Sequence, residues 1–287
     1  MNAAPSRSFA IVQGIALTVG AVAWVGWARG VSLTESVIGL GVLGAAFAAW
    51  LAWRKGWIGA REVLMLEAGA AATATSALGM QHAHWVAKPL AMVFALAAVA
   101  EGARRAIPGD RGDRHRPFRW LAAALAASLA GDVFLMLRGL FIPGLISFLV
   151  AHLCYLVLLR RGVPWFGHRP ALFATLALAV AMYTWLWLAG LPTMLRAPVA
   201  AYVLVIAAMA AQAWSRQRAL ATRSALLVAL GACSFMASDS LLAINRFVTP
   251  LPWSPLLILP TYYAAQALIV HGMLNEGSRP ASASTSG

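Results

Sequence analysis

Two aspartates stand inside otherwise apolar stretches of the chain, Asp132 and Asp239, and each is followed within two helical turns by an arginine, Arg138 and Arg246. A carboxyl group in hydrocarbon costs a few kcal/mol or more, so an intramembrane aspartate is by default a functional residue. Two carboxyls in a low-dielectric pocket can hold different protonation states. Such a pair can cleave an acetal-like bond through an oxocarbenium ion: one acid delivers a proton, and the other carboxylate stabilises the cation or activates water.

Other uses of the same aspartates stay open at this stage. The pair would equally serve a proton-coupled transporter of a lipid or small molecule, or Asp132 could form a buried ion pair with Lys88 or Arg138. The chain has no Gly-x-Ser-x-Gly or His-Glu-x-x-His motif, and its six histidines are scattered along the sequence. We therefore expect no metal site and no cofactor.

Further polar residues are placed by helical spacing and topology around the aspartates or on the same side of the membrane. Ser128 lies one turn before Asp132, and Tyr262 lies one turn before Gln266. The candidates for substrate binding or support are Lys88, Ser128, His152, Tyr155, Ser238, Asn245, Tyr262, Tyr263 and Gln266. Three cations could hold a lipid phosphate: Lys88, Arg138 and Arg246.

We expect membrane-spanning helices to carry these residues. Of the 287 residues, 61% are hydrophobic and only 11% charged, and the apolar residues fall in runs of about twenty, the length that spans a bilayer. We predict an all-α, polytopic bundle of about ten spans. The predicted ranges are 9–28, 33–53, 62–82, 86–103, 117–137, 140–160, 170–190, 197–214, 221–244 and 254–274.

Basic residues predict the orientation of this bundle. Most of the 22 lysines and arginines fall in alternate connecting segments, and the other set of segments contains only Arg29, Lys88, Arg138, Arg196 and Arg246. Because lysine and arginine gather in cytoplasmic loops, both termini should be cytoplasmic. Both aspartates then lie on outward-running helices, about 7 Å below the outer surface.

The formal charge of +13 belongs to these loops, so we expect the lipid bilayer and no nucleic acid as the partner. Cys154 and Cys233 both lie within apolar runs and are expected to be core residues. The sequence does not indicate an oligomeric state.

Several motifs together resemble those of the YhhN family of membrane proteins, which includes the lysoplasmalogenases. The resemblance runs from about residue 60 to 275 and is carried by Lys88-Pro89, Ser128-x-x-Gly131-Asp132-x-x-Leu135-Met136, Gly144-Leu145-x-x-Phe148-x-x-x-His152-x-x-Tyr155, Ser238-Asp239-x-Leu241-x-x-x-Asn245-x-Phe247 and Tyr262-Tyr263-x-x-Gln266.

The resemblance implies an eight-helix membrane core and hydrolysis of the vinyl-ether bond of a lysophospholipid substrate, a lysoplasmalogen. The products would be a fatty aldehyde and a glycerophospho-ethanolamine or -choline, with Asp132 and Asp239 as the catalytic carboxyls. The chain departs from the family by a two-helix N-terminal extension. We therefore expect an extension at residues 1–58, the membrane domain at 59–275 and a disordered tail at 276–287, in the inner membrane of a bacterium.

Overall fold

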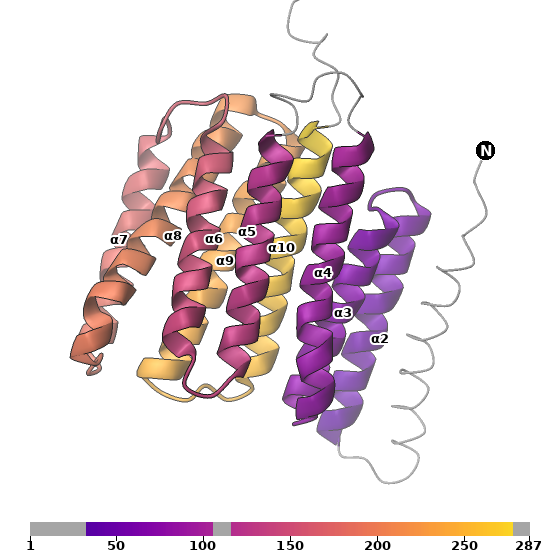
Figure 1. Ribbon diagram of the computed structural model, residues 1–287, viewed down its shortest axis with the longest axis horizontal. Helices are drawn as coiled ribbons and strands as arrows, with labels where there is room; N and C mark the ends of the chain where they lie inside the picture. The colour runs from indigo at the N-terminus through magenta and orange to yellow at the C-terminus, as the bar shows by residue number, and fades with distance from the viewer. Residues whose placement is uncertain (1–32, 106–115, 278–287) are drawn as a thin grey trace, which may run out of the picture. The chain divides into compact units, whose positions relative to one another are not determined.

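The computed structural model describes residues 33–105 and 116–277, and every regular element in these ranges is an α-helix (Figure 1). The helices are α2 (Leu33–Arg54), α3 (Ala60–Ala77), α4 (Gln81–Arg105), α5 (Arg116–Met136), α6 (Phe141–Arg160), α7 (Arg169–Leu188), α8 (Thr193–Leu220), α9 (Arg223–Phe247) and α10 (Ser254–Gly277). The predicted all-α fold is thus confirmed. The predicted helix at 9–28 and nearly all of the tail from 276 lie outside the described residues.

Seven of the described helices, α4 to α10, are long and apolar enough to cross a membrane. Hydrocarbon offers no hydrogen-bonding partner to the backbone, and a helix needs none because its backbone groups bond one another. The chain is therefore a multi-pass helical membrane protein. The count of ten spans and the cytoplasmic location of both termini stay predictions, as does the division at residues 58 and 275.

The described residues form two compact units, one ending at Phe94 and the other beginning at Ala95. In the first unit, α2 packs against α3 around Ala49 and Val63. The start of α4 is joined to α3 by the His84 ring, whose Nδ1 lies 2.9 Å from the carbonyl oxygen of Ala72. Lys88, a predicted site residue, belongs to this unit and is 8% exposed.

The second unit contains the end of α4 and the helices α5 to α10, which run up and down in alternation (Figure 1). Helix α6 packs on α5 and α8, and α9 packs on α8 and α10. The turns after α5, α7 and α9 lie at one end of this unit, which we call the Arg138 end. The turns after α6 and α8 lie at the other, which we call the Arg216 end (Figure 1).

Glycines allow the close approach of the helices that carry the aspartates. A Cβ at Gly231 of α9 would lie 2.9 Å from the carbonyl oxygen of Ala265 and 2.8 Å from Cγ1 of Ile269, both in α10. A Cβ at Gly131 of α5 would lie 2.6 Å from the ring of Phe148 in α6. Contacts this short exclude any larger side chain without movement of the neighbour, so these two glycines set the spacing around the site.

Candidate active site

Asp132 is buried between α5 and α10. The residue is only 2% exposed. The hydroxyl of Tyr262 in α10 donates a hydrogen bond to its Oδ2 over 2.7 Å. Gly131, immediately before it, leaves room for the Phe148 ring against α5. The sequence motif Gly131-Asp132 is therefore a place where a neighbouring helix packs closely against a buried acid.

Asp239 lies between α8, α9 and α6, and its side chain is 13% exposed. The hydroxyl of Tyr202 in α8 donates to Oδ2 over 2.5 Å. Nε2 of His152 in α6 lies 3.7 Å from the same oxygen, and this histidine is fully buried. Asp239 therefore has one close hydroxyl donor and one imidazole just beyond hydrogen-bonding distance.

One aromatic cluster joins the two aspartates. The ring of Phe235 in α9 is fully buried, and its centroid lies 4.6 Å from that of His152 and 5.5 Å from that of Tyr262. The two carboxyls predicted from the sequence to lie at one depth thus belong to a single site.

A second layer of buried polar groups surrounds this pair. Tyr155 in α6 donates a hydrogen bond to Oε1 of Gln266 in α10 over 2.5 Å, and both side chains are fully buried. Other buried polar atoms of α5 and α10 make no hydrogen bond within the described residues, namely Oγ of Ser128, the hydroxyl of Tyr263 and Nε2 of Gln266. Groups of this kind are suited to bind a polar part of a substrate or a water molecule.

Ser238 and Asn245, the remaining predicted site residues of α9, hold the local fold. Ser238 Oγ donates to the carbonyl oxygen of Ile258 over 3.0 Å, which fixes α9 on α10. Asn245 Oδ1 accepts from the backbone N–H of Leu251 over 2.8 Å and orders the turn between these helices. Their support of a substrate, like that of Lys88, stays a prediction.

An apolar groove leads to Asp239 from the Arg138 end. Its walls come mainly from α6, α7, α8 and α9, and Tyr202, Asp239 and Arg246 are among its few polar residues. A second, more polar pocket lies at the turn after α5, where it contains Arg138 together with Arg246. Asp132 lines neither, so of the two carboxyls only that of Asp239 is reached by the groove.

Sequence reasoning missed Tyr202 and Phe235. Each is a single aromatic residue in a long apolar run, and only the packing of α8 on α9 and of α9 on α6 gives it a role. No group of three or more histidine, cysteine, aspartate or glutamate side chains able to hold a metal ion occurs within residues 33–105 and 116–277.

Comparison with known proteins identifies several relatives. Lysoplasmalogenase TMEM86B of Homo sapiens is 39% identical over 160 residues, covering 54% of this chain and 64% of the relative. The lysoplasmalogenase of Mycobacterium bovis is 33% identical over 171 residues, covering 55% and 61%. Lysoplasmalogenase TMEM86A of Bos taurus is 33% identical over 156 residues, covering 50% and 61%.

These alignments span less than two thirds of the relatives' own length. No solved structure matches the chain. The model of the YhhN family matches residues 83–273, a range that contains both aspartates, both tyrosines bonded to them and the whole groove. The chain therefore belongs to the YhhN family.

Proposed function

We propose that this protein is a membrane hydrolase that cleaves the vinyl-ether bond of lysoplasmalogen-type lysolipids by carboxyl acid/base catalysis. The observation that carries the proposal is the pair of tyrosine-bonded aspartates, which one buried aromatic cluster joins, with an apolar groove that reaches Asp239. The relatives named lysoplasmalogenase support the same reaction. We place the protein in the inner membrane of a bacterium, with ten spans and the Arg138 end outward.

The reaction begins with a proton. A neutral carboxyl donates it to the vinyl carbon that is β to the ether oxygen, and the double-bond electrons form the new C–H bond. The resulting oxocarbenium ion is stabilised by the second, ionised carboxyl, which also removes a proton from the water that adds to the carbon bearing oxygen. The hemiacetal hydroxyl then gives its proton to the first carboxyl, now ionised, the bond to the glycerol oxygen breaks, and that oxygen takes the proton held by the second carboxyl. A fatty aldehyde and the glycerophospho-alcohol are released, and both carboxyls return to their starting states.

The hydrogen bonds of the site suit this division of labour. A tyrosine hydroxyl donates to one oxygen of each carboxyl, Tyr262 to Asp132 and Tyr202 to Asp239, and so orients both groups. His152, 3.7 Å from Asp239, is placed to orient water. Because these groups are buried among aromatic rings, where the dielectric constant is low, each interaction is stronger than the same interaction in water.

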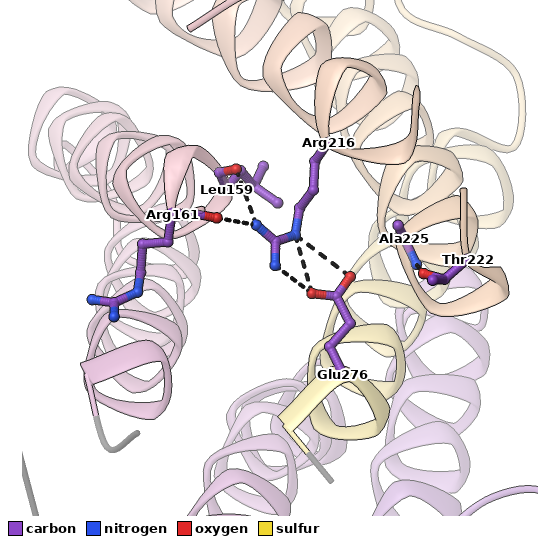
Figure 2. Close-up of polar contacts among 6 residues, drawn as sticks. All are labelled: Leu159, Arg161, Arg216, Thr222, Ala225 and Glu276. Atoms are coloured by element: carbon purple, nitrogen blue, oxygen red, sulfur yellow. Dashed lines mark hydrogen bonds and ion pairs between the residues drawn. The ribbon is translucent and has the colours of Figure 1, made fainter. Parts of the chain in front are cut away.

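Bonds at the Arg216 end weigh against the alternative, a proton-coupled transporter. Arg216 of α8 forms an ion pair with Glu276 of α10 over 2.5 Å, and its Nη1 donates to the carbonyl oxygen of Arg161, at the end of α6, over 2.6 Å (Figure 2). Gln212 of α8 also bonds the α6–α7 turn, accepting from the backbone N–H of Phe166 over 2.9 Å. A transporter must open both ends in turn, and here three helix ends are tied together.

The test is aldehyde release by the purified protein from a 1-alkenyl lysophospholipid. Asp132→Asn and Asp239→Asn should each lower the rate by about 10² to 10⁴-fold, because a carboxamide cannot donate or accept the proton. Glu101→Gln makes the same change at an acid paired with Arg105 on the surface of α4 and should leave the rate unaltered. A matched lysolipid with a saturated ether should not be cleaved, since it has no vinyl carbon to protonate.

Normal hydrolysis by both aspartate variants would exclude the carboxyl mechanism. Absence of aldehyde release by the unaltered protein, combined with proton-dependent uptake of a lipid into vesicles, would favour the transporter. A loss of folding in both variants, seen by thermal denaturation, would instead indicate a structural role for the aspartates.

A further inference from the structure

The two carboxyls differ in access, and the apolar groove is the reason. The groove is lined by Asp239, whose side chain is 13% exposed, and not by Asp132. We propose that the groove binds the hydrocarbon chain of the lysolipid while Arg138 and Arg246 hold its phosphate, so that Asp239 is the carboxyl that contacts the reacting bond. This inference rests on the proposed hydrolase function and assigns the orientation of the substrate.

The inner part of the groove suits a hydrocarbon chain. Its walls are aliphatic side chains from α6, α7 and α8, and these include Leu145, Leu178, Met182, Val203 and Ile206. A hydrocarbon chain that leaves water for such walls gains about 0.8 kcal/mol for each CH₂ group buried. A polar solute would find almost no hydrogen-bonding partner there.

The outer part of the groove suits a phosphate. Arg246 lines both the groove and the pocket at the α5–α6 turn, which also contains Arg138; Leu135 and Phe141 line both as well. The two pockets are thus adjacent, with Arg246 between them. The guanidinium of Arg246 stacks on the Phe141 ring, 5.1 Å from its centroid, and this contact holds the planar donor group at the rim. Two guanidinium groups at one rim can share the oxygens of a phosphate monoanion.

The order of residues along α9 matches the order of groups in a lysolipid. Arg246, Ala243 and Asp239 line the groove at successive turns of one helix face, and Met236 follows deeper. Arg246 and Asp239 are seven residues apart, or about 10 Å along the axis, a distance that the arginine side chain and a glycerol phosphate bridge together. Phosphate, glycerol, ether bond and chain then follow one another from the rim inward.

Asp132 faces the same cluster from the side away from the groove. It accepts a hydrogen bond from Tyr262, whose ring packs on Phe235 together with His152, the neighbour of Asp239. We therefore assign Asp132 as the second carboxyl of the pair, which acts on the water that adds to the oxocarbenium ion.

The experiment measures both binding and chain-length preference. Ala179 lines the groove and is 5% exposed, whereas the next residue, Val180, is 61% exposed and lies outside the lining. Ala179→Phe should weaken binding of a long-chain 1-O-alkyl lysophospholipid, which is not cleaved, about tenfold or more, and should shift hydrolysis toward short chains. Val180→Phe should change neither.

The phosphate is tested separately. Arg138→Gln and Arg246→Gln should each raise the Kd of the same alkyl lysophospholipid about tenfold, while binding of the matched alkyl glycerol without phosphate stays unchanged. Arg223→Gln, at the exposed start of α9 and the opposite end, is the control. Met182→Ala, which widens the groove without filling it, should increase tolerance of bulky branched chains and covers the case that Ala179→Phe fails to fold.

The outcomes separate this inference from the proposed function. Two results would overturn the groove assignment and leave the hydrolase intact. One is that Ala179→Phe and Val180→Phe change aldehyde release equally. The other is that both arginine variants weaken binding of the alkyl glycerol as much as binding of the alkyl lysophospholipid. Binding of the alkyl lipid that depends on the groove, without any cleavage of the alkenyl lipid, would overturn the hydrolase and leave the groove.

Discussion

Each aspartate of the site accepts a hydrogen bond from a tyrosine of another helix, and the two bonds have different consequences. The Tyr262 hydroxyl donates to Asp132, which does not line the groove. The Tyr202 hydroxyl donates to Asp239, which the groove reaches. A hydrogen bond to a charged group contributes roughly 1.5 to 3 kcal/mol. Tyr202 should thus hold the Asp239 carboxyl in the orientation that the reaction requires.

Removal of that hydroxyl tests its role. Tyr202→Phe keeps the ring and should lower kcat about 10 to 100-fold, because the Asp239 carboxyl loses its fixed donor. Tyr183→Phe is the matched control: it removes a hydroxyl that donates to the carbonyl oxygen of Arg196 over 3.1 Å at the α7–α8 hairpin. Initial rates of aldehyde release and thermal denaturation of both variants decide the matter; equal rates would show that Tyr202 only packs.

The sequence singled out both aspartates and Tyr262, the partner of Asp132, but not Tyr202, the partner of Asp239, and the reason is physical. An acid in an apolar run is costly, so Asp132 and Asp239 are visible without a structure. A tyrosine is common in such runs, and nothing in the spacing of Tyr202 distinguishes it from a residue that packs against lipid. Its role depends on how α8 sits on α9, which is set by the packing of whole helices.

Helix positions, by contrast, follow from hydrophobic runs and were predicted closely. Helix α3 ends at Ala77 rather than near 82, and the other large differences occur where helices extend past the apolar part. Helix α4 starts at Gln81 rather than near 86, so His82 and His84 are helical, and α8 runs Thr193–Leu220 rather than 197–214. The hydrogen bonds of a helix join backbone groups and do not depend on apolar side chains, so a helix can continue where the side chains become polar. Hydropathy alone therefore predicts helices α4 and α8 too short.

The close packing of α9 on α10 can be tested by substitution of a glycine at the contact. Gly231→Ala would place a methyl 2.9 Å from a backbone oxygen of α10, so we expect the protein to lose about 1 to 3 kcal/mol of stability and aldehyde release to fall, since Asp239 lies on α9. The same change at Gly44, an exposed residue of α2 with no atom within 4 Å of an added Cβ, should be neutral or slightly stabilising. Thermal denaturation in detergent compares the two; equal melting temperatures would contradict close α9–α10 packing.

At the scale of the whole molecule, the second unit has two chemically different ends. The Arg216 end is tied by the ion pair of Arg216 with Glu276 (Figure 2) and by the hydrogen bond of Gln212 in α8 to the α6–α7 turn. The Arg138 end carries the groove mouth and its two arginines. Substrate should therefore enter from one leaflet only, and the charge distribution predicts that this is the outer one.

Labelling of single cysteines tests that orientation. Arg138 and Arg218 are both exposed and lie at opposite ends of the unit, so a membrane-impermeant maleimide should label Arg138→Cys in intact cells and Arg218→Cys only after permeabilisation. The unaltered chain, with Cys154 buried and Cys233 partly buried, gives the background. The reverse pattern would turn the groove mouth to the cytoplasm and supply the site from the inner leaflet. It would leave the carboxyl chemistry unchanged, because the groove and both aspartates keep their positions relative to the Arg138 end.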